Sequence, residues 1–277
     1  MVPGLAITNF RIGTLAGDGT MDGSTSQATH QADATRTGRA PTRTLCVDVG
    51  GGHVKAAIVG PDSTELSDQV RVITPVGSPP SVLIETIAVL TAPLGAFDRV
   101  SVGFPGAVRN GVILTAPNLG GAEWHGFRLV EELSARLTRP VRLANDATVQ
   151  GLGAIAGRGL ECTITLGTGM GFALFTDGDP APHLELGQHI ARNKRSYDHY
   201  VGEAAFKVDG ARKWNKHVLK VIDALRVLVN FDMLYIGGGN AKRIDFDLAA
   251  DIHLVSNETG ITGGIRLWDG FPGPPGA

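Results

Sequence analysis

The sequence has few cysteines, little net charge and no long hydrophobic run. Cys46 and Cys162 are the only cysteines among 277 residues, and both lie in apolar segments, which favours buried free thiols over a disulfide framework. A formal net charge of -2 gives no global field that would attract nucleic acid. No apolar segment approaches the roughly 18 to 20 residues that span a bilayer, and the N-terminus lacks the pattern of a secretory signal. We therefore expect a cytoplasmic protein that binds neither nucleic acid nor membrane.

Large apolar residues are also scarce at the two ends of the chain. Residues 17–42 consist mainly of small and polar residues, and the last eight residues are rich in glycine and proline. Such segments bury too little apolar surface to offset the entropy lost on ordering. We predict a disordered N-terminal extension over residues 1–42 and a disordered tail over residues 270–277.

Between these ends, strand-like runs alternate with helical patterns, which favours an α/β fold. The expected strands cover residues 43–49, 53–59, 71–74, 100–103, 141–144, 163–166, 172–176 and 233–236. Helices are expected over 81–90, 126–137, from Asp146 to the glycines near Gly157, and up to about Asn230, with Asp146 able to cap the third. Both halves run strand, glycine turn, strand, helices. We therefore predict two related lobes, residues 43–145 and 146–269, with a ligand cleft between them.

Three glycine-rich turns follow β-prone runs, within the segments Asp48–Lys55, Leu166–Gly171 and Ile236–Asn240. Glycine lets backbone N–H groups approach an anion without a Cβ in the way, and turns at strand ends form concave anion sites. One such turn would be weak evidence, but three together predict a protein that folds around phosphates. Lys55, one strand residue beyond the first turn, either neutralises phosphate or is a solvated strand end.

Phosphoryl transfer to an alcohol requires a phosphate cradle, a divalent cation and a carboxylate that accepts the hydroxyl proton. The candidate base is Asp146, which follows a predicted strand and begins a predicted helix. Taken alone, Asp146 could equally be a helix cap. Asn145 offers a donor and an acceptor to a sugar diol, and it could equally be a turn residue.

These motifs together resemble the ROK family of sugar kinases, and within it the branch that includes polyphosphate glucokinases. The resemblance covers about residues 43–268 and rests on six segments in this order: Asp48–Gly51, Gly103–Gly106, Asn145–Ala147, Leu166–Gly171, Glu185–Gly187 and Gly237–Asn240. It implies an α/β, two-lobed actin-like ATPase (ribonuclease H-like) fold that closes on a sugar. It also implies a Mg²⁺-dependent transfer from ATP or polyphosphate to the 6-hydroxyl of glucose or a similar hexose, and pairing into a homodimer.

The resemblance also assigns roles to single residues. Asp146 would be the base, and the sugar hydroxyls would be held by Asn118, Asn145, Asp146 and Glu185, with Gln188 beside them. The phosphoryl donor would contact the three glycine turns through Asp48, Gly50, Gly51, Gly167, Thr168, Gly169, Gly238 and Gly239. From their positions in and after the first turn, Gly52 and Lys55 are added as candidate donor-binding residues. No residue is expected to form a dedicated metal site.

The chain departs from the family pattern at two positions of the expected site. Gly52 stands where the first turn normally has Thr or Ser, so a hydroxyl donor toward phosphate is missing. Gln188 stands where the family has histidine, with His189 one place later, and the cysteines of the family's zinc cluster are absent, so we expect no structural zinc. These departures motivate an alternative hypothesis, a catalytically weak sugar-binding or regulatory protein. A dinucleotide-binding oxidoreductase is disfavoured because the first turn leads into a β-prone run rather than a helix.

Eight basic residues between positions 192 and 220 are interleaved with aromatic residues: Arg192, Lys194, Arg195, Lys207, Arg212, Lys213, Lys216 and Lys220. A polyanion such as polyphosphate would be drawn to this surface by charge neutralisation. The alternative is an ordinary solvated helix face. His53 and His125 are candidate ligands, but a lone histidine is more often a surface residue.

Overall fold

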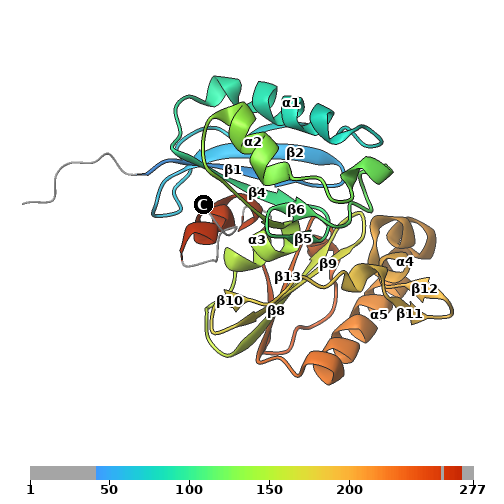
Figure 1. The fold of residues 1–277 in the computed structure, drawn as a ribbon. Helices are drawn as coiled ribbons and strands as arrows, with labels where there is room; N and C mark the ends of the chain where they lie inside the picture. Colours follow the sequence, from blue (N-terminus) through green and yellow to red (C-terminus); the bar gives the residue numbers. More distant parts are fainter. Residues whose placement is uncertain (1–41, 257–258, 270–277) are drawn as a thin grey trace, which may run out of the picture. The chain divides into compact units, whose positions relative to one another are not determined.

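Two five-stranded mixed sheets organise the chain in the computed structural model, which describes residues 42–256 and 259–269 (Figure 1). The first sheet contains β1 (Thr44–Val49), β2 (His53–Val59), β3 (Val70–Ile73), β4 (Arg99–Phe104) and β7 (Val141–Asn145) in the order β3-β2-β1-β4-β7. β2 runs antiparallel to β1, whereas β4 and β7 run parallel to it. The predicted strands of this half are therefore present, with ends shifted by at most one residue.

The second sheet repeats this arrangement. It contains β8 (Leu160–Leu166), β9 (Met170–Thr176), β10 (Asp179–Pro180), β13 (Met233–Gly237) and β14 (Ile252–Leu254) in the order β10-β9-β8-β13-β14. β9 is antiparallel to β8, and β13 and β14 are parallel to it, as in the first sheet. The internal repeat predicted from the glycine turns is thus present in the topology.

Helices α1 (Pro80–Thr91) and α2 (Leu129–Leu137) pack on each other and on the first sheet (Figure 1). Their buried leucines and isoleucines join the apolar residues of β1, β2 and β4 in one core. The prediction that α2 starts at Gly126 is wrong. Gly126 has φ +80, outside the helical region, and the Phe127 carbonyl accepts the Ile113 N–H. Phe127 still packs on the core, which is why it matched the helical spacing.

Short elements connect β4 to β7 on this side of the molecule. They are β5 (Val108–Arg109), β6 (Val112–Ile113) and the short helix η2 (Ala122–Trp124), while η1 (Ala92–Leu94) extends α1. Trp124 from η2 is almost fully buried and packs at 5.4 Å from the Phe104 ring.

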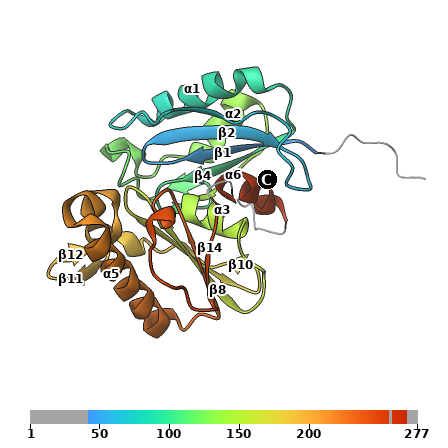
Figure 2. The ribbon, with the colours of Figure 1, turned by 180° about the vertical axis from the view of Figure 1, so that it is seen from behind.

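Helix α3 (Asp146–Leu152) lies between the two sheets and contacts β4 of the first and β8 and β9 of the second (Figure 2). Its cap is Asn145, whose Oδ1 accepts the N–H groups of Ala147 and Thr148 at 2.9 and 3.3 Å. The interpretation of Asp146 as the cap is therefore wrong, because Asn145 has the extended backbone of a capping residue and Asp146 is already helical. The helix also ends before Gly153, short of the predicted end near Gly157.

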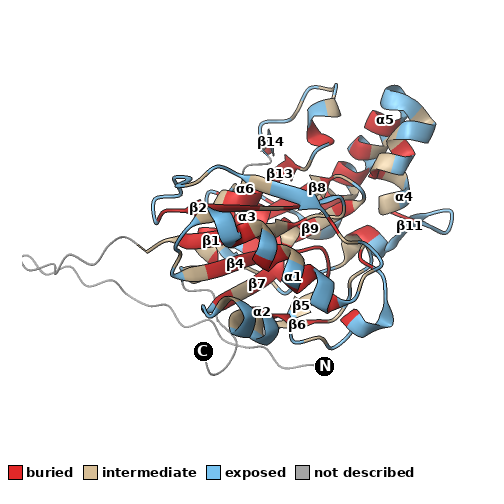
Figure 3. Ribbon diagram, turned by 90° about the horizontal axis from the view of Figure 1, so that it is seen from above, coloured by how far each residue is buried: buried red, intermediate tan, exposed pale blue. Residues whose placement is uncertain are grey.

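The second sheet is covered by α5 (Glu203–Val229), which follows the short α4 (Asp198–Val201). Along α5, buried residues lie on one side of the helix and exposed residues on the other (Figure 3). The helix ends at Val229, close to the predicted end near Asn230, and Asn230 caps it in the left-handed conformation. Its start is 15 residues earlier than Val218, where the apolar pattern begins, and Gly210 with φ 73 kinks it.

The remaining elements surround the second sheet or return to the first. They are η3 (Leu186–Gln188), the hairpin β11 (Ile190–Arg192) and β12 (Arg195–Ser196), η4 (Ala241–Arg243), α6 (Thr259–Thr262) and η5 (Gly263–Trp268). α6 and η5 pack against β1, β4 and α3. The lobe boundary after Asn145 stays a prediction. The boundary matches the end of β7, but the C-terminal segment of α6 and η5 packs on the first sheet although it lies in the predicted second lobe.

The predicted disordered ends lie outside the described residues, apart from Thr42. Among the helices of residues 42–256 and 259–269, none is long and apolar enough to cross a membrane. Cys46 in β1 and Cys162 in β8 are buried free thiols, as predicted, and burial raises the pKa of each to about 12.

Candidate active site

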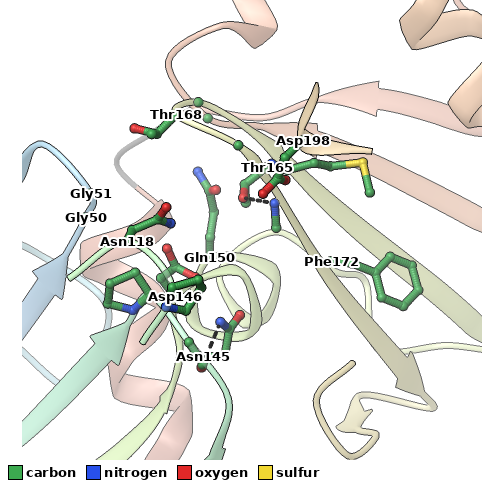
Figure 4. Close-up of a pocket in the computed structure, with 18 of the residues that line it drawn as sticks. Gly50, Gly51, Asn118, Asn145, Asp146, Gln150, Thr165, Thr168, Phe172 and Asp198 are labelled. Carbon is green, nitrogen blue, oxygen red and sulfur yellow. Dashed lines mark hydrogen bonds between the residues drawn. The ribbon is translucent and has the colours of Figure 1, made fainter. Parts of the chain in front are cut away.

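A cavity of about 370 Å³ is lined by residues from both halves of the chain (Figure 4). Every site residue predicted from the sequence lies in its wall: Asp48, Gly50, Gly51, Gly52, Lys55, Asn118, Asn145, Asp146, Gly167, Thr168, Gly169, Glu185, Gln188, Gly238 and Gly239. Of the two histidines considered, His53 lines the cavity and His125 does not. The structure thus brings together in one place residues as far apart in the chain as Asp48 and Gly239.

Strand direction explains this convergence. Asp48 lies near the carboxyl end of β1, and Asn145, Leu166 and Gly237 are the last residues of β7, β8 and β13. Parallel strands end at the same edge of a sheet, and ligands of open α/β sheets bind outside these carboxyl ends. The three glycine turns and the Asn145–Asp146 pair therefore face one cavity.

The first glycine turn is held by backbone and threonine contacts. The Gly50 N–H donates to the His53 carbonyl at 2.9 Å, and Thr74 donates through Oγ1 to the Gly50 carbonyl at 2.6 Å. A Cβ on Gly51 would lie 3.2 Å from Thr168 Oγ1. The first turn therefore packs directly against the second, and a side chain at Gly51 would narrow the space between them.

The second and third turns hold each other in place. The Asn240 side chain donates through Nδ2 to the Gly167 carbonyl at 3.1 Å, and the Asn240 N–H donates to the Leu166 carbonyl at 2.9 Å. Gly238 has φ +86, and a Cβ there would lie 2.3 Å from the Leu166 carbonyl oxygen. Glycine is required at this position both for the backbone conformation and for the close approach of the two turns.

Asp146 is one of three carboxyl groups in the cavity wall whose pKa is raised, with Asp48 and Asp198. Burial raises its pKa to about 7, and the negative charges of Asp48 and Glu185 act in the same direction, while the Ala147 N–H, which donates to Oδ1 at 2.8 Å, opposes the shift. Burial also raises the pKa of Asp48, against the attraction of Lys55, whose Nζ lies 3.6 Å from Asp48 Oδ2. A carboxylate with a pKa near neutrality can accept a proton and release it again at physiological pH.

The Asn145 side chain is engaged within the protein. Its Oδ1 caps α3, and its Nδ2 donates to the carbonyls of Phe104 and Gly106 at 3.3 and 3.2 Å. These contacts fix the start of α3 and hence the position of Asp146. A direct role of Asn145 toward a sugar stays a prediction. Asn118 also lines the cavity, beside the first glycine turn. A Cβ added to Gly51 would lie 3.7 Å from the Cβ of Asn118.

Glu185 and Gln188 each have a polar partner that sequence reasoning missed. His183 Nε2 lies 2.9 Å from Glu185 Oε1, and the His183 side chain is only 7% exposed. Gln188 donates through Nε2 to Asp198 Oδ2 at 2.5 Å, and the other oxygen of Asp198 accepts the Met170 N–H at 2.7 Å. His183 and Asp198 both line the cavity. Burial raises the pKa of Asp198, and the negative charge of Glu185 adds to this effect.

Gln150 is a third lining residue that the sequence analysis missed. It lies one helical turn after Asp146 on α3, so the two share a face, a spacing that could have identified it. A Cβ on Gly237 would lie 2.9 Å from the Gln150 amide, so Gln150 packs under the third glycine turn. Asp198 carries no such signal, because the hairpin before it has no recognisable pattern.

The chain matches the family model described as the ROK family over residues 44–184, half of its length. It is 31% identical over 208 residues to the polyphosphate glucokinase of Mycobacterium tuberculosis (strain ATCC 25618 / H37Rv), which covers 72% of this chain and 78% of the relative. It is 32% identical over 142 residues to the N-acetylmannosamine kinase of Escherichia coli (strain SE11), covering 49% of this chain and 48% of the relative.

Solved structures show the same fold. The inorganic polyphosphate/ATP-glucomannokinase from Arthrobacter sp. strain KM matches with a TM-score of 0.73 and 29% identity, over 81% of this chain and 97% of that protein. A ROK family glucokinase from Streptomyces griseus, solved with glucose and AMPPNP, matches in fold with a TM-score of 0.68 at 18% identity, over 81% of this chain and 98% of that protein. The expected two-lobed actin-like α/β fold is confirmed. The family model and the Mycobacterium tuberculosis relative together show that the chain belongs to the ROK family.

Proposed function

We propose that this protein is a glucokinase-type phosphotransferase, which transfers a phosphoryl group from ATP or inorganic polyphosphate to the 6-hydroxyl of glucose or a similar hexose. The observation that carries the proposal is the position of Asp146, a carboxylate of raised pKa in a cavity whose walls include all three glycine turns. The names of the M. tuberculosis and Arthrobacter relatives support the choice of donor and sugar.

In this mechanism Asp146 is the general base. The hexose 6-hydroxyl donates a hydrogen bond to the Asp146 carboxylate and loses its proton to it as the oxygen bonds to phosphorus and the bond to the leaving phosphate breaks. The pKa of about 7 makes the carboxylate a stronger proton acceptor than an ordinary aspartate while leaving a large part of it ionised at neutral pH.

The sugar would be oriented by Glu185, Gln188, Asn118 and Asn145. Glu185 is held by His183, which leaves one carboxylate oxygen of Glu185 without that bond. The amide nitrogen of Gln188 donates to Asp198, so the amide oxygen of Gln188, Oε1, is the atom that would accept a hydrogen bond from a sugar hydroxyl. Asp198 would support the same end of the cavity.

The donor phosphates would be held by the glycine turns through Asp48, Gly50, Gly51, Gly52 and Lys55 on one side and Gly167, Thr168, Gly169, Gly238 and Gly239 on the other. Mg²⁺ usually binds substrate phosphates, several waters and one or two carboxylates rather than a protein cage. The described residues contain no cluster of three or more acidic, histidine or cysteine side chains that could hold a metal, and Asp48 beside the first turn can supply a carboxylate. The residues therefore fit a donor-bound Mg²⁺, which would neutralise the phosphates.

A coupled assay for hexose phosphorylation, run separately with ATP and with polyphosphate, tests the proposal. Asp146→Asn should lower kcat by on the order of 10² to 10⁴ with either donor. Asp247→Asn is the matched control, because Asp247 is exposed and lies outside the cavity. Full activity of the Asp146→Asn variant would remove Asp146 from the role of base.

The second candidate, a sugar-binding or regulatory protein, is motivated by Gly52 and Gln188. It predicts a wild-type protein that binds glucose but phosphorylates no hexose with either donor. Calorimetric titration with glucose beside the coupled assay separates the two functions. A homodimer remains a prediction from the family resemblance.

A further inference from the structure

Residues 190–220 are strongly basic in a chain that carries a slight negative charge. The segment contains eight lysines and arginines and three acidic residues. Lys207 pairs with Glu203 at 3.6 Å and Lys213 with Asp209 at 2.6 Å. The other six are exposed and take part in no ion pair within the described residues. We call these six the basic tract: Arg192, Lys194, Arg195, Arg212, Lys216 and Lys220.

The part of the basic tract on α5 lies along one side of the helix. Arg212, Lys216 and Lys220 follow one another at intervals of four residues, so they share a face about 12 Å long. The opposite face carries buried Trp214 and Val218, which pack on the second sheet. Packing therefore turns the three charges toward solvent.

The part on the β11–β12 hairpin adjoins α5 through direct contacts. Tyr200 Oη donates to the Arg192 carbonyl at 3.1 Å, and the Tyr200 ring meets the His217 ring edge-on at 5.1 Å. Lys213 lowers the pKa of Asp209 on α5, and the nearby charge of Arg195 lowers it further. The hairpin and the helix thus lie next to each other and form one surface, with Asp209 of α5 near basic residues of both.

This surface begins at the candidate active site. The hairpin is flanked in the chain by Gln188 and Asp198, which line the cavity and hydrogen-bond to each other. At the start of α5, the Glu203 N–H donates to the Gly167 carbonyl in the second glycine turn at 2.9 Å. The α5 part of the basic tract therefore leads away from the second glycine turn, where donor phosphates are expected, and the hairpin starts beside Gln188 and Asp198 at the sugar end of the cavity.

We propose that the basic tract binds the part of a linear inorganic polyphosphate chain that extends beyond the cavity. This inference rests on the proposed function. A nucleotide carries its negative charge on a few adjacent phosphates, whereas a long polyphosphate carries negative charge along its whole length. Basic side chains spaced along a surface gain affinity for such a chain by releasing its counterions, so binding should increase with chain length and weaken with salt.

The test compares Arg212→Gln/Lys216→Gln/Lys220→Gln with the control Arg71→Gln/Arg109→Gln/Arg158→Gln. The control removes the same charge from exposed arginines outside the basic tract. Binding of fluorescent long-chain polyphosphate is measured against salt concentration, and KM is measured for long-chain polyphosphate, tripolyphosphate and ATP. We expect the tract variant to bind long chains at least about tenfold more weakly at low salt, with a salt slope smaller by about 2. Its KM for tripolyphosphate, ATP and glucose should match wild type, and the control should behave like wild type throughout.

If the two triple variants bind long-chain polyphosphate equally and have equal KM for it, the proposed role of the basic tract is wrong, while the kinase function still stands. The converse outcome, no hexose phosphorylation by wild type but tract-dependent binding of long-chain polyphosphate, would overturn the kinase function and support the tract. Tighter binding of a single-stranded RNA of equal charge than of polyphosphate would assign the surface to a different partner.

Discussion

At the scale of the residue, Asp146 illustrates how burial and a neighbouring carboxylate together raise the pKa of an aspartate. Burial is the main cause of its raised pKa, and Asp48 adds repulsion across the cavity. The Ala147 N–H stabilises the ionised form but does not offset these effects. The result is a base whose proton affinity lies near neutral pH, which an isolated aspartate would not have.

The first prediction concerns the pH dependence of the rate. Because Asp146 must be ionised to accept a proton, kcat/KM for the hexose should fall about tenfold per pH unit below its pKa of about 7 and level off above it. A pH profile of initial rates measures this. Asp48→Asn removes one of the charges that raise this pKa, so the midpoint of the remaining activity should move to lower pH. A midpoint near pH 4 in wild type would contradict the assignment.

The second prediction concerns Gly52, where a hydroxyl is expected by family resemblance. A Cβ at this position would meet no atom within 4 Å, so a side chain fits. Gly52→Thr should lower KM for the donor by up to about tenfold, because a hydroxyl can donate to a charged phosphate oxygen. Gly52→Val has the same shape without the hydroxyl and serves as the control. If the valine variant improves KM equally, the hydroxyl is not the cause.

At the scale of the element, the strands were predicted more accurately than the helices. Each central strand is a short apolar run ended by glycine or a polar residue, and this pattern is visible without knowledge of its neighbours. The α5 helix was found only from Val218 onward, because its first half contains the Gly210 kink and few apolar residues. The β11–β12 hairpin was missed because its strands are two and three residues long and mostly exposed.

The third prediction concerns the loop between β13 and η4. Gly238→Ala should destabilise the protein by about 1 to 3 kcal/mol, because alanine is strained at φ +86 and its Cβ would clash with the Leu166 backbone. Urea unfolding measures the change. Gly239→Ala is the stability control, because a Cβ there meets no atom within 4 Å. Equal losses in the two variants would show that the close approach of the turns is unimportant.

At the scale of the whole molecule, the cavity exists because the carboxyl ends of strands from both sheets supply its wall, with α3 packed between the sheets. Asn145 couples these parts, since it caps α3 and also donates to the loop after β4. This arrangement lowers the stability of the fold, because three carboxylates that repel one another, Asp48, Asp146 and Glu185, line the same cavity.

The fourth prediction is that Asp146→Asn stabilises the fold at high pH. The folded-state pKa of Asp146 is raised from 3.8 to about 7, so the unfolded chain ionises first, and wild-type stability falls as pH rises through this interval. The free energy of unfolding of the variant minus that of wild type should not depend on pH below pH 4. It should increase between pH 4 and 7, by at most about 4 kcal/mol, and should then stay constant at higher pH. Chemical denaturation across pH measures this. A variant that is less stable at pH 8 than at pH 4, relative to wild type, would contradict the raised pKa.

The sequence by itself determined the alternation of strands and helices and the repeat of glycine turns, and its resemblance to the ROK family pointed to fifteen residues that line the cavity. Local patterns suffice for these features, because glycine, apolar runs and short motifs act through the backbone next to them. Only the tertiary structure decided that Asn145 caps α3, that His183 and Asp198 join the site, and that the hairpin brings its charges beside α5. These features depend on contacts between segments far apart in the chain, where packing and burial, rather than local preference, set the position and the charge of each group.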